Sequence, residues 1–268
     1  MTASEWFLLN FEIHRRIDEL GLIQVFDDGN KRYLSFGTAD EQSCMLKQDP
    51  LQLQHDYSRA MLASLLMFAD QSPAHITMLG LGGGSLPRVM HHLLPEAEIA
   101  IVELRKAVAD IARQFFYLPR NGRLQIHIEE AGEWLDQAEA GQCQWLMSDL
   151  FLADGLDQQQ LQQQFIERCY RHLAPGGWLV LNFWREHRDE PLWLWQLKQR
   201  FPEVLHATTK DGNWILWAQK PLLEDAAEPL LLSEKTLRQQ AKELSTAAKF
   251  NLWQAAKPFY RNRQRGPR

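Results

Sequence analysis

The stretch Met78-Leu-Gly80-Leu-Gly82-Gly83-Gly84-Ser85 decides the fold, because an apolar run passes through four glycines into a segment with helical spacing. Glycine lets the backbone turn sharply and lets a ligand approach where a Cβ atom would collide. The start of a helix also presents free N–H groups to whatever lies over the loop. No Lys-Ser/Thr follows the glycines, which excludes a Walker phosphate loop. The stretch predicts a ligand-binding loop, or else a tight strand-to-helix turn that holds no ligand.

An acidic residue follows at the position that a nucleoside site needs. Glu103 closes the next apolar run, 99–104, and stands 23 residues after Gly80. A carboxylate there can accept hydrogen bonds from both hydroxyls of a ribose, as in dinucleotide sites, although it can also be a solvated cap. Loop and acid together predict a nucleoside site, and NAD fits these two features alone.

From residue 76 onward, apolar runs alternate with segments of helical spacing. This alternation is typical of a parallel sheet with helices on both faces. The last two runs are joined by Asp211-Gly212 and predict an antiparallel strand at the end of the sheet. We expect a doubly wound α/β fold of the class I methyltransferase type, with strands over 76–81, 99–104, 124–128, 143–149, 178–184, 203–208 and 213–218, and helices over 85–94, 106–116, 131–139, 158–173 and 192–200.

The flanking segments have different patterns. Two β-rich runs over 22–36 surround Asp28-Gly29 and predict a hairpin, and 51–68 has helical spacing that breaks at 70–73. Residues 235–268 hold nine Lys/Arg against one acid, Glu243, after a possible N-cap at Ser233. We interpret this tail as a solvated helix docked on the domain, with a weak contact to RNA or anionic lipid as the alternative. The expected regions are 1–70, 71–220 and 221–268.

The composition is that of an ordinary cytoplasmic protein. A net charge of −5 gives no general reason to expect nucleic acid or membrane as a partner. There is neither a secretory signal pattern nor an apolar run of ~18 residues. Three scattered cysteines indicate reduced, packed thiols, and the nine dispersed histidines show no metal-ligand spacing, so no metal site is expected.

Later landmarks favour adenosylmethionine or a close analogue over NAD. The third strand ends at Glu129-Glu130, the fourth ends in Ser148-Asp149, and the fifth follows Pro175-Gly-Gly177. An acid after the third strand can accept a hydrogen bond from an adenine amino group, which makes Glu130 a candidate contact.

Over roughly residues 22–218 the sequence resembles the spermidine synthase (polyamine aminopropyltransferase) family. The resemblance implies binding of adenosylmethionine or its decarboxylated form as donor, an amine as acceptor, and commonly a homodimer. It places Asp149 on the strand that carries the family's catalytic aspartates, with Asp154 and Tyr57 as further catalytic candidates. The residues it assigns to the donor are Gln42, Gly80, Gly82, Gly83, Gly84, Ser85, Glu103, Glu130 and Asp149.

Three departures from the family concern the substrates. Ser85 follows the glycines where an aspartate is usual, and Ser58-Arg59 follow the tyrosine where the family has His-Glu. Asp149 and Asp154 stand five apart rather than three. If Arg59 points into the pocket it repels a cationic amine, which favours an acceptor that is neutral, anionic or smaller than putrescine. If Arg59 turns outward, the aspartates are left to recruit the amine.

The chemistry leaves three functions open. An amine that attacks the carbon beside a sulfonium must first lose a proton, and a carboxylate can take it; Asp149 is the first candidate and Asp154 the second. The main hypothesis is aminopropyl transfer to a small-molecule acceptor. The alternatives are methyl transfer from adenosylmethionine and nucleoside binding without catalysis. No Asn/Asp-Pro-Pro-aromatic motif of the common amino-methylating enzymes follows the fourth strand.

Overall fold

A seven-stranded sheet forms the centre of the molecule, in the order β12-β13-β11-β8-β5-β6-β7. The computed structural model describes residues 11–38, 41–68, 71–189, 191–222 and 232–264. All neighbouring strands run parallel except β13, which pairs antiparallel with both β11 and β12. The strands are β5 (His75–Leu79), β6 (Glu98–Glu103), β7 (Leu124–Ile128), β8 (Cys143–Ser148), β11 (Leu173–Trp184), β12 (Glu203–Thr208) and β13 (Asn213–Gln219).

The predicted fold class is confirmed, with one refinement at the end of the sheet. The antiparallel strand β13 is not the edge strand, since it lies between β11 and β12. The tight turn after β12 brings the chain straight back, so that β13 fills the space beside β11.

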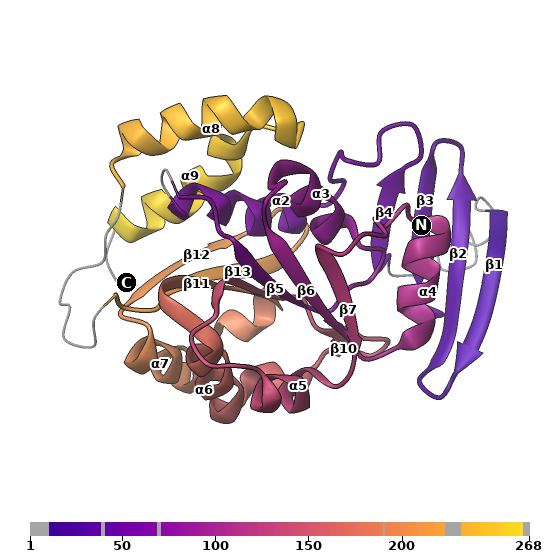
Figure 1. Ribbon diagram of the computed structural model, residues 1–268, viewed down its shortest axis with the longest axis horizontal. Coiled ribbons are helices and arrows are strands. Elements are labelled where there is room, and N and C mark those ends of the chain that lie inside the picture. The colour runs from indigo at the N-terminus through magenta and orange to yellow at the C-terminus, as the bar shows by residue number, and fades with distance from the viewer. Residues whose placement is uncertain (1–10, 39–40, 69–70, 190, 223–231, 265–268) are drawn as a thin grey trace.

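Helices cover both faces of the sheet (Figure 1). Alternate strand residues point to opposite faces. Within β8, for example, Trp145 and Met147 join one core cluster while Leu146 joins the other. One face carries α3 (Ser85–Leu93) and α4 (Lys106–Phe115), and the other carries α5 (Ala131–Gln137), α6 (Gln163–His172) and α7 (Pro191–Arg200). The helix predicted over 158–173 is divided, because a short 3-10 turn, Gln158–Leu161, precedes α6.

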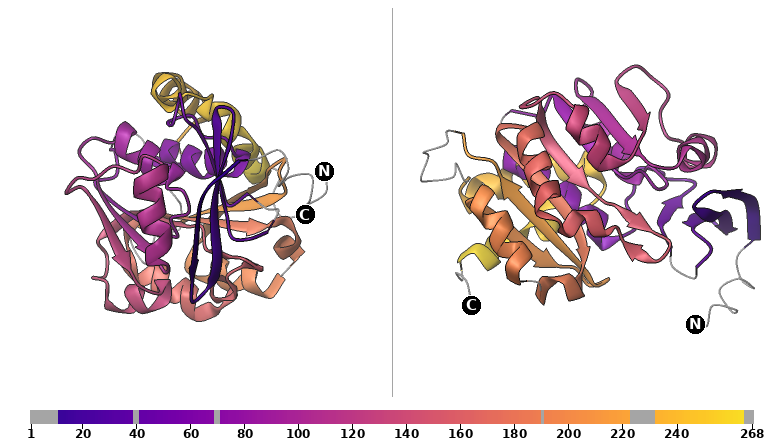
Figure 2. Two further views of the ribbon diagram at one scale, coloured as in Figure 1. Left: turned by 90° about the vertical axis from the view of Figure 1, so that its right-hand side faces the viewer. Right: turned by 90° about the horizontal axis from the view of Figure 1, so that it is seen from below.

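The N-terminal region forms its own antiparallel sheet of β1 (Phe11–Asp18), β2 (Gly21–Asp28), β3 (Lys31–Ser35) and β4 (Ser43–Leu46). The hairpin at Asp28-Gly29 is confirmed, and Gly29 has the positive φ of 54° that such a turn requires. The sheet packs on α4, where Val25 and Leu34 meet Val108 and Ile111 in a buried cluster. Figure 2 shows it at one end of the molecule, beside α4.

The connection between the two sheets is a shorter helix than predicted. Helix α2 spans Asp56–Leu62 and continues as a 3-10 helix over Ala63–Phe68, so Leu53 precedes the helix. The predicted break over 70–73 is confirmed at residues 71–73, which are not helical, while Asp70 lies outside the described residues.

The tail docks on the domain, as the sequence predicts, but it is two helices rather than one and is more deeply buried than a solvated helix. It forms two helices, α8 (Glu234–Ala248) and α9 (Leu252–Gln264), which cover one face of the sheet (Figure 1). Phe259 of α9 is buried and stacks on Trp217 of β13 with ring centroids 3.8 Å apart. Before and after Lys249, apolar residues on one side of each helix are buried against the domain, while the basic side of each helix faces solvent. Arg265 and Arg268 of the tail lie outside the described residues.

The described residues contain no helix of the length and apolar character that a membrane span requires.

Candidate functional site

A cavity of about 700 Å³ lies along the carboxyl ends of the parallel strands. This is the edge where doubly wound sheets bind their ligands. The glycine loop, Glu103 and Asp149 form one wall, and β4 with the start of α2 forms the opposite wall. The predicted site residues that line the cavity are Gln42, Tyr57, Gly80, Gly82, Ser85, Glu103, Asp149 and Asp154, whereas Gly83, Gly84 and Glu130 do not.

The glycines of the loop serve two purposes. A Cβ atom on Gly80 (φ +87°) would stand 2.4 Å from the backbone oxygen of Asp149, so this glycine lets β5 and β8 meet at the cavity floor. Gly83 and Gly84 are packing positions, where a Cβ would meet Ser43 and Leu118 respectively. Ser43 of β4 also accepts a hydrogen bond from the Gly83 N–H at 2.8 Å, which ties the N-terminal sheet to the loop.

Glu103 is buried at the end of β6 and is oriented by backbone donors. Its Oε2 accepts from Leu81 N at 3.0 Å and its Oε1 from Arg105 N at 2.8 Å. Burial raises the pKa of this carboxyl, and the backbone hydrogen bonds oppose that effect. Each carboxylate oxygen has a second lone pair, so the group can still accept two hydroxyls from a ligand in the cavity.

Glu130 has a local structural task that the sequence analysis did not anticipate. It is the N-cap of α5, and its carboxylate accepts from Gly132 N at 2.9 Å and Glu133 N at 2.8 Å. Such a cap stabilises a helix start by about 1 kcal/mol. Its role as an adenine contact stays a prediction.

Asp149 opens onto the cavity from the end of β8. Protein atoms surround the rest of the carboxyl, and this burial raises its pKa to about 6, while a hydrogen bond from Asn182 lowers it. The Asn182 amide donates to Asp149 Oδ1 at 2.8 Å. A carboxylate with a pKa near neutrality is suited to take a proton at physiological pH.

Asp154 also lines the cavity, but it is exposed at the tip of a small hairpin. The hairpin strands are β9 (Phe151–Leu152) and β10 (Gly155–Leu156), which pair antiparallel. Asp154 therefore lies at the rim of the cavity, while Asp149 lies at its floor.

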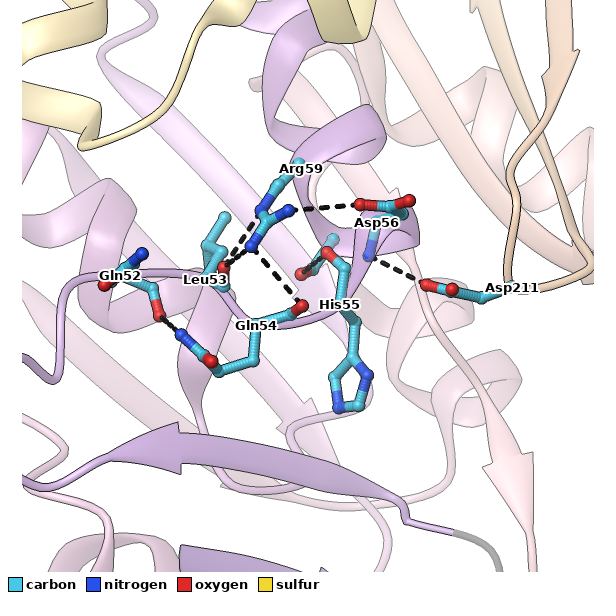
Figure 3. A network of polar contacts seen from close by, with 8 residues as sticks. Gln52, Leu53, Gln54, His55, Asp56, Arg59 and Asp211 are labelled. Carbon is cyan, nitrogen blue, oxygen red and sulfur yellow. Dashed lines mark hydrogen bonds and ion pairs between the residues drawn. The ribbon is translucent and has the colours of Figure 1, made fainter. Parts of the chain in front are cut away.

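The start of α2 contributes Tyr57 and His55 to the opposite wall. Their rings stack with centroids 5.4 Å apart. Nε2 of His55 is shielded from solvent and has no hydrogen-bond partner among the residues that the structure describes, and burial lowers the pKa of the ring. Burial also raises the pKa of Tyr57 well above its usual value, so it stays a neutral hydroxyl. The helix start is held by Asp211, whose carboxylate accepts from Asp56 N at 3.0 Å (Figure 3).

Arg59 does not line the cavity, so the structure follows the outward alternative. Its guanidinium donates to the carbonyl of Leu53 at 2.6 and 2.9 Å and pairs with Asp56 at 3.1 Å. Figure 3 shows it on the side of the chain opposite to the imidazole of His55. Arg59 therefore does not repel a cationic acceptor in the cavity. The reason to expect an acceptor that is neutral, anionic or smaller than putrescine is removed.

The charge of the cavity wall is acidic. Among the described residues that line it, the one Lys or Arg is Arg105, whose guanidinium is bound by Asp18 and the carbonyl of Gly21. The acids of the wall are Glu41, Glu103, Asp149, Asp154, Asp157 and Asp211.

A comparison with known protein families agrees with this site. The sequence model of the spermine/spermidine synthase domain matches residues 55–193, just over half of the chain. The chain belongs to the spermine/spermidine synthase family. The matched segment contains Tyr57, the glycine loop, Glu103 and Asp149.

Individual members of this family are moderately similar. The polyamine aminopropyltransferase of Chromobacterium violaceum is 35% identical over 173 residues, 63% of this chain and 64% of that protein. The polyamine aminopropyltransferase of Neisseria meningitidis serogroup A is 36% identical over 167 residues, 60% of this chain and 61% of that protein. The similarity thus spans less than two thirds of these relatives. The human eEF1A lysine and N-terminal methyltransferase is 27% identical over 213 residues, 70% of this chain and 30% of that protein.

Solved structures confirm the fold. A probable spermidine synthase from Corynebacterium glutamicum superposes with a TM-score of 0.71 at 23% identity, covering 87% of this chain and 86% of that one. Human methyltransferase-like protein 13 in complex with SAH gives 0.62 at 22% identity, covering 73% and 93%. A spermidine synthase in complex with the transition state analogue AdoDATO gives 0.71 at 16% identity, covering 93% and 85%.

The sequence analysis of this family member missed several polar cavity residues, four of which lie around Asp149 and the start of α2. They are His55, Asn182, Asp211 and Asn213. Asn182 had a readable signal, since it is the one polar residue in the run Trp178–Trp184 and falls at the carboxyl end of a strand. The other three flank a helix start or a turn. They come together in the cavity through contacts between segments that are far apart in the sequence, and a local sequence pattern does not reveal such contacts.

Proposed function

We propose that the protein transfers an aminopropyl group from decarboxylated adenosylmethionine to a small cationic amine. The observation that carries the proposal is the placement of Glu103 and Asp149 on one wall of a single cavity. In this proposal Glu103 accepts the ribose hydroxyls, and Asp149 meets the acceptor at the sulfonium end of the nucleoside. Two structural neighbours were solved in complex with SAH and with AdoDATO, which supports an adenosyl donor.

At the glycine loop, where the donor is proposed to bind, the cavity wall holds a buried polar atom without a hydrogen-bond partner among the described residues. Ser85 Oγ is shielded from solvent and has no hydrogen bond within the described residues. An unsatisfied buried hydroxyl costs about 1–3 kcal/mol, so a ligand that reaches it gains affinity. This supports a polar donor over the glycine loop.

The reaction needs a proton acceptor and charge compensation. The acceptor amine donates a proton to the Asp149 carboxylate, and its nitrogen lone pair attacks the aminopropyl carbon next to sulfur. A C–N bond forms, the C–S bond breaks, and its electron pair neutralises the sulfonium to give methylthioadenosine. The carboxylate opposes the positive charge of donor and amine before transfer.

The acidic wall favours a cationic acceptor. Two further carboxylates line the same cavity as Asp149, namely Asp154 at the rim and Asp211, which lies beside the start of α2. An ammonium 4 Å from such a group gains about 1 kcal/mol in water and several at lower effective dielectric constant.

A second candidate function is methyl transfer from adenosylmethionine. Ser85 stands at the start of α3 where the family usually has an aspartate, and the free N–H groups of a helix start tolerate a carboxylate. The human eEF1A lysine and N-terminal methyltransferase is among the similar proteins. The two candidates differ in donor and by-product.

Calorimetry with a donor panel tests the proposal. Wild type should bind decarboxylated adenosylmethionine and methylthioadenosine, with weaker binding of adenosylmethionine. Glu103→Ala should lower each affinity at least tenfold, because it removes two hydrogen bonds to a charged acceptor, each worth about 1.5–3 kcal/mol. The control is Glu133→Ala, which changes an exposed residue of α5 and should leave the affinity for each ligand as in wild type. Equal affinities for wild type and Glu103→Ala would refute the ribose assignment, and preference for adenosylmethionine would favour the methyltransferase.

A further inference from the structure

Two asparagines connect Asp149 to the last hairpin of the central sheet. Asn182 of β11 donates its amide N–H to Asp149 Oδ1 at 2.8 Å. Asn213 of β13 in turn donates its amide N–H to Asn182 Oδ1 at 3.0 Å. All three side chains line the cavity, and Asn182 is 1% exposed. The contacts form a linear series from the strand edge to the carboxylate.

The sheet register explains why these amides meet. Asn182 lies directly opposite Ile215 in the antiparallel pair of β11 and β13. Asn213 is two residues before Ile215, so both asparagines point to the same face as diagonal neighbours. Asn213 is itself held by the hairpin turn, where its backbone N–H donates to Thr209 Oγ1 at 3.1 Å and its carbonyl accepts from Thr209 N at 2.8 Å.

We propose that Asn182 and Asn213 form an amide relay that positions the Asp149 carboxylate for proton transfer. An amide presents a donor on one side and an acceptor on the other. Because Asn213 donates to the Asn182 oxygen, the Asn182 amide is locked with its NH₂ group toward Asp149. The role in proton transfer rests on the proposed function, whereas the geometry of the relay does not.

The choice of an amide matters for the chemistry. A hydrogen bond to the charged form of a carboxyl lowers its pKa, and a lysine or arginine would lower it much further. The neutral amide orients Asp149 while leaving it basic enough to accept a proton from an ammonium. The other titratable groups that line the cavity are Glu41, Cys44, His55, Tyr57, Glu103, Arg105, Asp154, Asp157 and Asp211. None of them makes a hydrogen bond to Asp149 in the described residues.

Carbon-13 titration of the Asp149 carboxyl in the ligand-free full chain tests the relay. Asp149→Asn identifies the signal. Asn182→Leu removes the donor at similar volume and should raise the pKa of Asp149 by about one unit, the equivalent of one hydrogen bond to a charged group. Asn213→Ala removes the hydrogen bond that holds the Asn182 amide in its orientation, and it should raise the pKa of Asp149 by a smaller amount.

Gln219→Leu is the matched control, because it removes an amide from the far end of β13, where Gln219 donates to Gly176 O. It should leave the pKa of Asp149 unchanged. An unchanged or lowered pKa in folded Asn182→Leu would overturn the relay. If Asn182→Leu does not fold, Asn213→Ala decides by the same criterion.

This experiment separates the relay from the proposed function, because the titration requires neither donor nor acceptor. A raised pKa in a protein without transferase turnover would support the relay and refute the function. Turnover by wild type with no pKa change in the asparagine variants would refute the relay alone.

Discussion

Asp149 illustrates, at the scale of one residue, how a functional group opposes stability. Its carboxyl is surrounded by protein except toward the cavity, and within the described part of the chain it accepts a hydrogen bond from one group, the neutral amide of Asn182. A charge in such a place is poorly solvated, so its ionised form destabilises the fold. The same environment raises its proton affinity toward the range that a general base needs.

Asp149→Asn should therefore stabilise the protein at high pH. The pKa rises from 3.8 to about 6 on folding, so the favourable contribution is complete below pH 3.8 and is lost as the pH rises through about 6. At pH 8 the variant should gain at most about 3 kcal/mol in free energy of unfolding, less any solvation by cavity water. At pH 4 the gain should nearly vanish. Denaturant titrations at both pH values measure it, and destabilisation at pH 8 would contradict the assigned environment.

Residue roles differed in how far the sequence predicted them. Glu103 and Asp149 follow from strand ends, because side chains at that edge of a parallel sheet converge. Arg59 could not be placed, since an arginine one turn into a helix has several rotamers and here binds the carbonyls of the preceding loop. Glu130 was assigned to the ligand, but the same position also begins a helix, and its carboxylate caps it.

At the scale of elements, the α8–α9 hairpin is part of the core. Leu237, Ala241, Leu252 and Phe259 are all buried against the sheet face. A chain ending near residue 225 would expose Trp217 and its neighbours to water. The tail thus contributes to the stability of the domain that carries the site.

Phe259→Ala should test this contribution without truncation. The side chain is 1% exposed and stacks on Trp217, so its loss should reduce the free energy of unfolding by about 3–5 kcal/mol. Gln254→Ala, exposed on the same helix, should change it by less than about 0.5 kcal/mol. Chemical denaturation of both variants measures the difference, and equal stabilities would show that α9 does not cover the core.

Elements with strong periodicity were predictable, and short or charged ones were not. The strands and helices from β5 to β13 match their expected positions in most cases. The exceptions are the split before α6, the unpredicted β9–β10 hairpin, and β11, which begins at Leu173 rather than at residue 178. β1 was missed because FEIHRRID is largely exposed and charged, and β4 because it has four residues. The docking of the tail was predicted, but its second helix was missed, because the few large apolar residues after Lys249 stand among basic ones and only the fold shows that they are buried.

At the scale of the whole molecule, the cavity exists because two sheets meet. The central sheet supplies Glu103 and Asp149 through local rules of β-α succession, whereas Gln42 and Tyr57 reach the opposite wall through β4 and α2. The bond from Gly83 N to Ser43 Oγ joins the two parts at the glycine loop. The first half was predictable from pattern, and the second required the family resemblance.

The most direct test of the account is product analysis with decarboxylated adenosylmethionine and a panel of amines that includes putrescine. Wild type should release methylthioadenosine at an ordinary enzymatic rate, roughly 1 per second. Asp149→Asn should still bind the donor, but its rate should be about 10²–10⁴-fold lower, as expected when a general base is lost. Release of adenosylhomocysteine from adenosylmethionine, or no methylthioadenosine with any amine, would contradict aminopropyl transfer in this cavity.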